Sequence, residues 1–317
     1  MTGRPGRRGG ASMGDRVFES LCRGAGLFVL LLLGAIIVTL FIGGLPAFRE
    51  FGAGFLWSAD WNPVEGRESY GALVPVLGTI ISAVLAILLA VPVAFGIAFF
   101  LTELAPEWLR QPIATAIELL AAIPSIIYGM WGRFVLVPFV QQNIQLTIGD
   151  ALGSIPLVGF LFESRSFAGT SLFTAGLVLA IMILPFIAAT MRDVFTQVPP
   201  VFKESAYGLG ATRWEVVRGV VLPYTRISVV GGIMLGLGRA LGETMAVTFV
   251  IGNANRISTT LFGPGNTIAS VVALEFGESE TGSLKLSALL ALGFLLFVIS
   301  FVVLAASRYL LRPRLKT

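Results

Sequence analysis

The sequence has no histidine and a single cysteine, Cys22. One cysteine cannot form an intramolecular disulfide, and zinc sites of the common cysteine and histidine types lack their ligands. The commonest general base is missing, and no Gly-x4-Gly-Lys-Ser/Thr sequence for ATP binding occurs. The sequence also has no recognisable nucleophile–base pair. We therefore expect a protein that is not itself an enzyme and that binds no metal or cofactor of its own.

Charged residues are also scarce. They make up 13% of the 317 residues, whereas hydrophobic residues make up 56%. A soluble domain has about 25% charged residues, so this composition indicates a chain whose solvent is a lipid bilayer. The net charge is +4, but the basic residues flank apolar runs and do not share one polar face. This distribution argues against a nucleic-acid partner.

Six apolar runs reach the length of about 20 residues that a membrane-spanning helix needs. They cover approximately residues 25–45, 73–101, 113–140, 171–191, 224–251 and 284–311. Pro92, Pro124 and Pro185 lie inside these runs and are expected to kink the helices. The predicted fold is all-α, a polytopic membrane protein with six transmembrane helices in a permease domain over residues 25–317. Residues 1–24 are predicted to be a disordered basic tail.

The distribution of lysine and arginine predicts the orientation of the chain. If the N-terminus is cytoplasmic, 14 of these residues lie in cytoplasmic segments and four lie in the outer loops. Positively charged residues are retained on the cytoplasmic side of membrane proteins. We therefore predict a multi-pass protein with both termini in the cytoplasm.

The longest cytoplasmic loop, about residues 192–223, has a pattern of its own. Thr212 and Glu215 fit a capping box, and Gly210 suits the turn before it. We predict two short helices, one before Gly210 and one that starts near Thr212. The pattern alone is equally compatible with a connector that lies on the membrane surface.

Arg239 and Glu243 form a charged pair inside the fifth apolar run. Arg239 lies about 15 residues past Tyr224, roughly 22 Å along a helix and deep in an apolar core of about 30 Å. A central arginine costs at least ~2.5–3.5 kcal/mol on insertion scales. Glu243 lies four residues later, on the same side of a helix. The pair is either a structural ion pair or, as we favour, a guanidinium that meets a translocating oxyanion and is held by Glu243 when the path is empty.

The third apolar run holds two further candidates for a polar path. Ser125 follows Pro124, where a kink is expected, and Tyr128 lies about one turn later. Either side chain has a polar group that suits a translocation path. For Ser125, simple helix packing is an equally good interpretation.

The cytoplasmic loop resembles the coupling loop of ABC importer permeases, which has the pattern Glu-Ala-Ala-x3-Gly followed by Ile-x-Leu-Pro. Ser205 and Val220 depart mildly from this pattern. The resemblance implies that the first short helix docks into a groove on a cytoplasmic ATPase. Tyr207, Leu209 and Trp214 are candidates for the buried contacts. The residues that match the pattern are Glu204, Ala206, Gly210, Leu222 and Pro223.

From about Phe51 to the C-terminus the sequence is similar to phosphate permeases of the PstC family. The resemblance implies a type I ABC importer permease fold and transport of inorganic phosphate across the bacterial inner membrane. It gives Arg239 and Glu243 the roles of the arginine and glutamate that matter in that family, whereas Arg133 stands where an apolar residue is expected. The stretches that carry the resemblance are residues 61–64, 70–72, 78–79, 123–132, 239–245 and 264–270.

The family also implies partners. They are a second permease of the PstA type, two copies of a PstB-type ATPase that holds ATP and magnesium, and a periplasmic phosphate-binding protein of the PstS type. Charge alone leaves another oxyanion open, such as sulfate or molybdate. A carrier or anion channel that needs no ATPase is the alternative from a different class, and the coupling loop argues against it.

Overall fold

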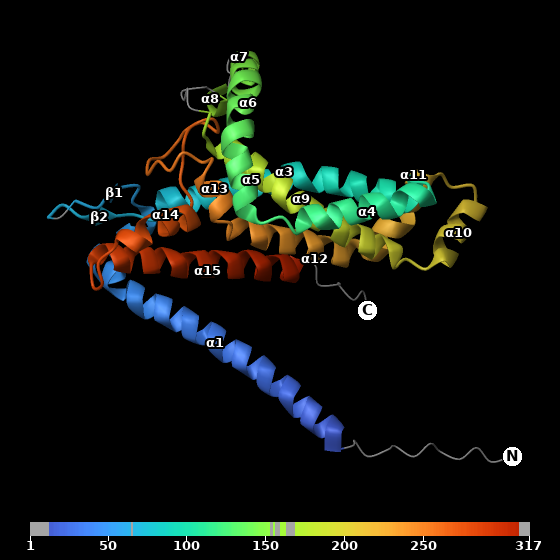
Figure 1. Cartoon of the computed structure of the whole chain (residues 1–317), viewed down its shortest axis with the longest axis horizontal. Helices are drawn as coiled ribbons and strands as arrows, with labels where there is room; N and C mark the ends of the chain where they lie inside the picture. The colour runs from blue at the N-terminus through green and yellow to red at the C-terminus, as the bar shows by residue number, and fades with distance from the viewer. Residues whose placement is uncertain (1–12, 65, 153–154, 156–158, 163–168, 311–317) are drawn as a thin grey trace.

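The computed structural model describes residues 13–64, 66–152, 155, 159–162 and 169–310. Long helices make up most of this part of the chain (Figure 1). Among the described residues, five helices are long and apolar enough to cross a membrane, and a bent pair of helices makes a sixth span if it is counted as one. The prediction of an all-α chain with six spans is confirmed.

Except for the first helix, the long helices start within two residues of the predicted positions, because long apolar runs are a strong local signal. Two of them are extended by π-helical segments. Segment η1 (Phe100–Leu104) continues the second span, and η4 (Val217–Val221) joins the short helix α11 (Arg213–Val216) to the fifth. The long helices are α1 (Met13–Phe51), α3 (Leu73–Phe99), α9 (Leu172–Thr196), α12 (Leu222–Leu241) and α15 (Leu284–Leu310).

Helices α3 and α9 form the centre of the core. One face of α3 is a stripe of fully buried alanines spaced three or four residues apart. Small side chains let two helix backbones approach closely, which is how helices pack when lipid removes the hydrophobic driving force. Gly176 of α9 fits against Leu85 of α3 for the same reason. The alanines of the stripe are Ala83, Ala86, Ala90, Ala94 and Ala98.

Helix α1 diverges from the other helices and contacts α15 only through its C-terminal half (Figure 1). Gly44 lies so close to Ala291 that a Cβ atom there would be 2.8 Å from the Ala291 Cα. The helix begins at Met13, so residues 13–24 of the predicted tail are helical. An ion pair between Glu19 and Arg23, one turn apart, supports this extension. Residues 1–12 of the tail lie outside the described residues.

The third predicted span is two helices, α4 (Glu107–Ala121) and α5 (Ser125–Trp131), and their directions differ by 89°. The break lies at Pro124, which has no N–H to donate and which disfavours helix in the residue before it. By contrast, Pro92 and Pro185 do not interrupt α3 and α9. The helical path then continues through η2 (Gly132–Leu136), α6 (Val137–Phe139), η3 (Val140–Gln145) and α7 (Leu146–Leu152).

The fifth span ends earlier than predicted. Helix α12 stops at Leu241, and after a three-residue break the chain forms one further turn, α13 (Met245–Thr248). The expected helix to residue 251 is therefore wrong. Gly242 lies in the break, and glycine is a poor helix former, so the continuous apolar run concealed an interruption.

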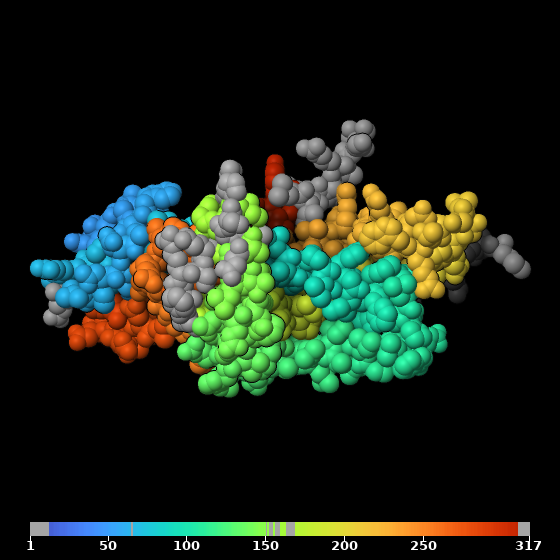
Figure 2. Space-filling view, turned by 90° about the horizontal axis from the view of Figure 1, so that it is seen from above, coloured from blue at the N-terminus to red at the C-terminus, as the bar shows by residue number. Residues whose placement is uncertain are grey.

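The segments that connect the spans gather at opposite ends of the molecule (Figures 1 and 2). One end carries an antiparallel hairpin in which Trp61 pairs with Tyr70. The other end carries α10 (Pro200–Gly208) and α11. The hairpin end is made of β1 (Trp61–Asn62), β2 (Ser69–Tyr70), α2 (Gly54–Trp57), α14 (Ile268–Glu275) and η5 (Phe276–Glu278), whereas α8 (Gly159–Phe162) contacts α7.

Candidate functional site: the coupling helices and the Arg239 break

The predicted pair of short helices is present between the fourth and fifth spans. Gly210 has a φ of +87°, a conformation that favours glycine. Thr212 and Glu215 form the capping box: the Glu215 carboxylate accepts from the Thr212 N–H at 2.7 Å, and the Thr212 hydroxyl accepts from the Glu215 N–H at 3.4 Å. The turn and the cap together hold α10 and α11 in a defined angle.

Helix α10 is tied to the end of the second span by Glu103, a residue of η1. The Lys203 ammonium lies 2.6 Å from one Glu103 carboxylate oxygen, and the Tyr207 hydroxyl donates to the other at 3.4 Å. Burial and the Glu103 carboxylate raise the pKa of the Tyr207 hydroxyl, which therefore stays protonated and able to donate. Sequence analysis missed Glu103, although a lone acid at the end of an apolar run was the available signal.

Trp214 is half-exposed and also packs against the chain's own second span. Its ring packs edge-on against Phe99, with centroids 5.9 Å apart, and against Phe95 at 6.4 Å. Ala206 also packs against the core of the chain. Leu209, in contrast, is 90% exposed between the two helices. Of the three predicted partner contacts, Leu209 is therefore the most accessible.

The remaining residues of the loop pattern lie either on the exposed surface of α10 or at the beginning of α12. Glu204 is exposed on α10. Leu222 and Pro223 lie where the π-helical segment η4 passes into α12, inside one continuous helical span. The pattern thus runs continuously from the exposed helix α10 into the fifth span.

Arg239 lies in the last turn of α12, next to the break. It is exposed, and within the described part of the chain it makes no ion pair and no hydrogen bond. Its charge acts electrostatically on the hydroxyl of Tyr128. An arginine in an apolar span normally has a partner, and none of the described residues supplies one to Arg239 through an ion pair or a hydrogen bond.

Glu243 lies in the break after α12 and not on the same helix as Arg239, because the helix has already ended at Leu241. Its carboxylate accepts a hydrogen bond from the backbone N–H of Ala246 at 3.1 Å, at the start of α13. The predicted direct hold of Glu243 on Arg239 is absent: no ion pair joins these two described residues. The interruption of the helix removes the four-residue spacing on which that expectation depended.

Helix α5 packs against the break from the other side. A Cβ atom on Gly129 would lie 2.9 Å from the Ala246 Cα, so the two segments touch closely. Tyr128 is half-buried and donates to the Leu120 carbonyl at 2.9 Å across the bend between α4 and α5. Ser125 is half-buried at the first position of α5. The fold thus brings Tyr128 to the region of Arg239.

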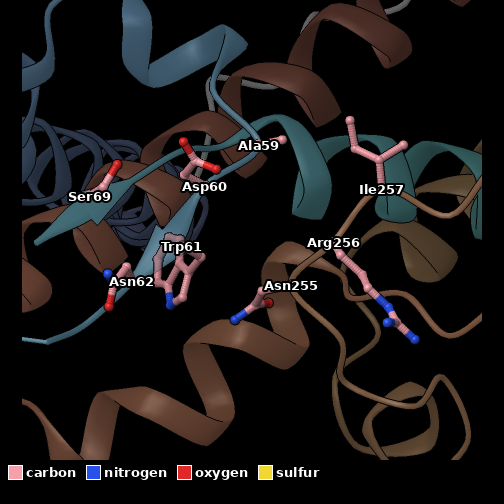
Figure 3. Close-up of a pocket in the computed structure, with 8 residues that line it drawn as sticks. All are labelled: Ala59, Asp60, Trp61, Asn62, Ser69, Asn255, Arg256 and Ile257. Carbon is pink, nitrogen blue, oxygen red and sulfur yellow. The ribbon is translucent and has the colours of Figure 1, made fainter.

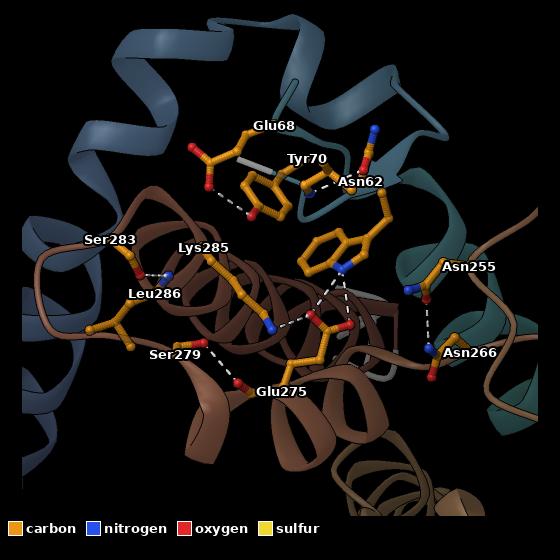
Figure 4. A network of polar contacts seen from close by, with 12 residues as sticks. Asn62, Glu68, Tyr70, Asn255, Asn266, Glu275, Ser279, Ser283, Lys285 and Leu286 are labelled. Atoms are coloured by element: carbon orange, nitrogen blue, oxygen red, sulfur yellow. Dashed lines mark hydrogen bonds and ion pairs between the residues drawn. The ribbon is translucent and has the colours of Figure 1, made fainter. Parts of the chain in front are cut away.

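A polar network at the hairpin end was not predicted. The Trp61 indole N–H donates to Glu275 at 2.9 Å, and the Lys285 ammonium lies 3.3 Å from the same carboxylate. Figure 4 shows Lys285 beside Glu275. The Tyr70 hydroxyl donates to Glu68 at 3.3 Å, and burial, with that carboxylate, raises the pKa of Tyr70. These contacts join the hairpin to α14 and α15.

A pocket of about 530 Å³ opens beside the hairpin. Residues 59–62 and Ser69 line one part, and Asn255, Arg256 and Ile257 line the other (Figure 3). Asn255 is held in place because its amide oxygen accepts from the Asn266 side chain at 2.7 Å. The pocket is open and mixed in charge, since it includes both Asp60 and Arg256. Among the described residues, no group of three or more acidic or cysteine side chains is placed to hold a metal ion.

The described part of the chain thus combines membrane-spanning helices with two short helices at one end and a polar hairpin region at the other, an arrangement that suits the membrane subunit of a transport system. Residues 90–317 match the family described as the binding-protein-dependent transport system inner membrane component. The chain belongs to this family.

Curated relatives agree over most of the chain. It is 59% identical to "Phosphate transport system permease protein PstC" of Pasteurella multocida (strain Pm70) over 94% of its own length and 91% of that protein's. It is 57% identical to the protein of the same name from Haemophilus influenzae, over 92% and 91% of the two lengths. The homologues are thus permeases of phosphate transport systems.

A solved structure has the same fold. One chain of a bacterial alginate ABC transporter, in complex with an alginate pentasaccharide-bound periplasmic protein, superposes with a TM-score of 0.57. The likeness covers 96% of this chain and 99% of that one at 17% identity. It shows that the helices described above are arranged as in an ABC importer permease.

Proposed function

We propose that this chain is the membrane-spanning permease subunit of an ATP-driven importer of inorganic phosphate in the bacterial inner membrane. The observation that carries the proposal is the 59% identity to a phosphate permease over nearly the whole chain. The free guanidinium of Arg239 supports it. An anion that leaves water loses hydration energy, and a guanidinium offsets that loss with two parallel hydrogen bonds to phosphate oxygens.

The proposed complex contains a second, homologous permease of the PstA type, a PstB-type ATPase dimer and a periplasmic binding protein of the PstS type. ATP and magnesium are bound and used in the ATPase, and this chain contributes no catalytic group. With both termini in the cytoplasm, α10 and Gly210 face the ATPase, and the hairpin end faces the periplasm. The permease domain comprises the spans and the connecting coupling loop.

The proposed mechanism is alternating access. The binding protein delivers phosphate to the hairpin end, and ATP-driven closure of the ATPase moves α10 as a rigid body. Leu222 and Pro223 pass this movement into α12, which carries Arg239. Tyr128 and Ser125 line the path beside Arg239, while Glu243 holds the start of α13 and so sets the position of the break.

The proposal is tested by measuring phosphate uptake in proteoliposomes that contain the whole complex. Arg239→Gln is expected to abolish uptake while the subunits still assemble, because the anion loses the cationic partner that the proposal assigns to it. Arg226→Gln, at an exposed position of the same helix, is the matched control and is expected to transport normally. Normal uptake by the Arg239 variant would refute the assigned role.

Two further arms address the alternatives. Excess sulfate or molybdate that competes with phosphate would indicate another oxyanion as the substrate. Uptake by the permeases without the ATPase would indicate a carrier. We expect neither, because the relatives are phosphate permeases and the coupling pattern is present.

A further inference from the structure

The inner end of the second span and the coupling loop are joined by one carboxylate. Glu103 is buried, with 7% of its side chain exposed, although it lies at the end of the molecule that carries the exposed helix α10. Its two oxygens are used by two residues one turn apart on α10: Lys203 at 2.6 Å and Tyr207 at 3.4 Å. One face of α10 is thereby directed at the span.

The second coupling helix is held at the same place. Arg213, the first residue of α11, donates from its guanidinium to the main-chain carbonyl of Glu103 at 3.0 Å. Trp214, the next residue, packs edge-on against Phe95 and Phe99 of α3. Both helices of the loop therefore contact the last turns of the second span, about 100 residues earlier in the chain.

The contacts leave the other face of the loop open. Leu209 is 90% exposed and Glu204 is exposed. Segment η1 is π-helical, and π-helical turns place side chains differently from the α-helix that precedes them. Here the π-turn lies where Glu103 meets α10. The loop formed by α10 and α11 therefore has one face that contacts the second span and an opposite face that is free to contact a partner subunit.

We propose that Glu103 is a positioning residue that fastens coupling helix α10 to the second span, so that a movement of the ATPase reaches α3 directly as well as α12 through the chain. The proposal rests on the proposed function, since it concerns how that importer is driven. A buried ion pair suits this role, because separating its charges in a poorly hydrated site is unfavourable. The helix and the span then move as one body.

The test compares phosphate transported with ATP hydrolysed in proteoliposomes containing the whole complex. Glu103→Gln and Lys203→Met are each expected to lower the phosphate-to-ATP ratio severalfold, because either change removes the ion pair that fastens α10 to the second span. The double variant is expected to be no worse than the worse single variant, because both remove the same contact. A double variant whose loss is the product of the single losses would overturn the proposal.

Glu118→Gln is the matched control. Glu118 also forms an ion pair between helices, and among the described residues its ion-pair and hydrogen-bond partner is Arg192 of α9, at 2.8 Å, rather than a residue of α10 or α11. This variant should keep the wild-type ratio. Tyr207→Phe removes only the hydroxyl contact with Glu103, so it can be measured even if the Glu103→Gln complex does not assemble. It should lower the phosphate-to-ATP ratio less than Glu103→Gln does.

A purely stabilising ion pair would lower the amount of assembled complex and leave the ratio unchanged, and this result would also overturn the proposal. Failure of the wild-type complex to take up phosphate would instead count against the proposed function. The two failures are therefore distinguishable, because one is read from the variants and the other from the wild type.

Discussion

Gly78 is the position where adding one methyl group should do the most damage. It lies on α3, and a Cβ atom there would be 1.9 Å from the carbonyl oxygen of Asn266. That oxygen belongs to the loop before α14, and the next contact is also buried: the Ile268 N–H donates to the Thr79 hydroxyl at 3.0 Å. Gly78→Ala must therefore move main-chain atoms and cannot be relieved by rotating a side chain.

The cost follows from these two contacts. Overpacking of a filled core costs about 1–3 kcal/mol, and a buried N–H left without its acceptor costs about 1–3 kcal/mol more. We expect Gly78→Ala to lose about 2–6 kcal/mol of stability if the hydrogen bond of Ile268 breaks. Gly96 is the matched control on the same helix, since no heavy atom lies within 4 Å of its added Cβ.

The measurement is the thermal midpoint of the purified complex, followed by tryptophan fluorescence. Gly78→Ala should lower the midpoint by at least about 4 °C, given about 2–4 °C per kcal/mol for large domains. Gly96→Ala should leave it unchanged or raise it slightly, because alanine favours helix more than glycine does. Equal midpoints for the two variants would show that the loop and α3 are not in contact as described.

Two further predictions concern the opposite ends of the molecule. Gly210→Val should lower the phosphate-to-ATP ratio, because a side chain at a residue with a φ of +87° strains the backbone by about 1–2 kcal/mol. Gly219→Val, at an exposed position, is its control. Unaltered coupling in the Gly210 variant would count against the docking role. The pKa of Tyr70 is raised in the folded protein, so above about pH 10 its hydroxyl loses its proton more readily in the unfolded protein than in the folded one. Thermal stability should therefore fall as the pH rises above about 10, and Tyr70→Phe should fall less steeply; parallel curves for the two proteins would contradict this.

The sequence by itself determined the features that depend on neighbouring residues. Long apolar runs marked the spans, and the Thr212 and Glu215 capping box and the positive φ of Gly210 produced the two short helices. A kink was predicted at Pro124, where the chain breaks into two helices, but kinks were predicted equally at Pro92 and Pro185, where the helices are not interrupted. Each of these signals lies within a few residues of the structure it predicts.

Only the tertiary structure decided the contacts that join distant segments. The sequence does not show that α4 and α5 meet at 89°, or that α12 ends before Glu243. The pairing of Glu103 with Lys203 requires two parts of the chain 100 residues apart to be brought together. Such contacts depend on how the helices pack, and packing is set by the shapes of all the neighbouring side chains at once rather than by any local pattern.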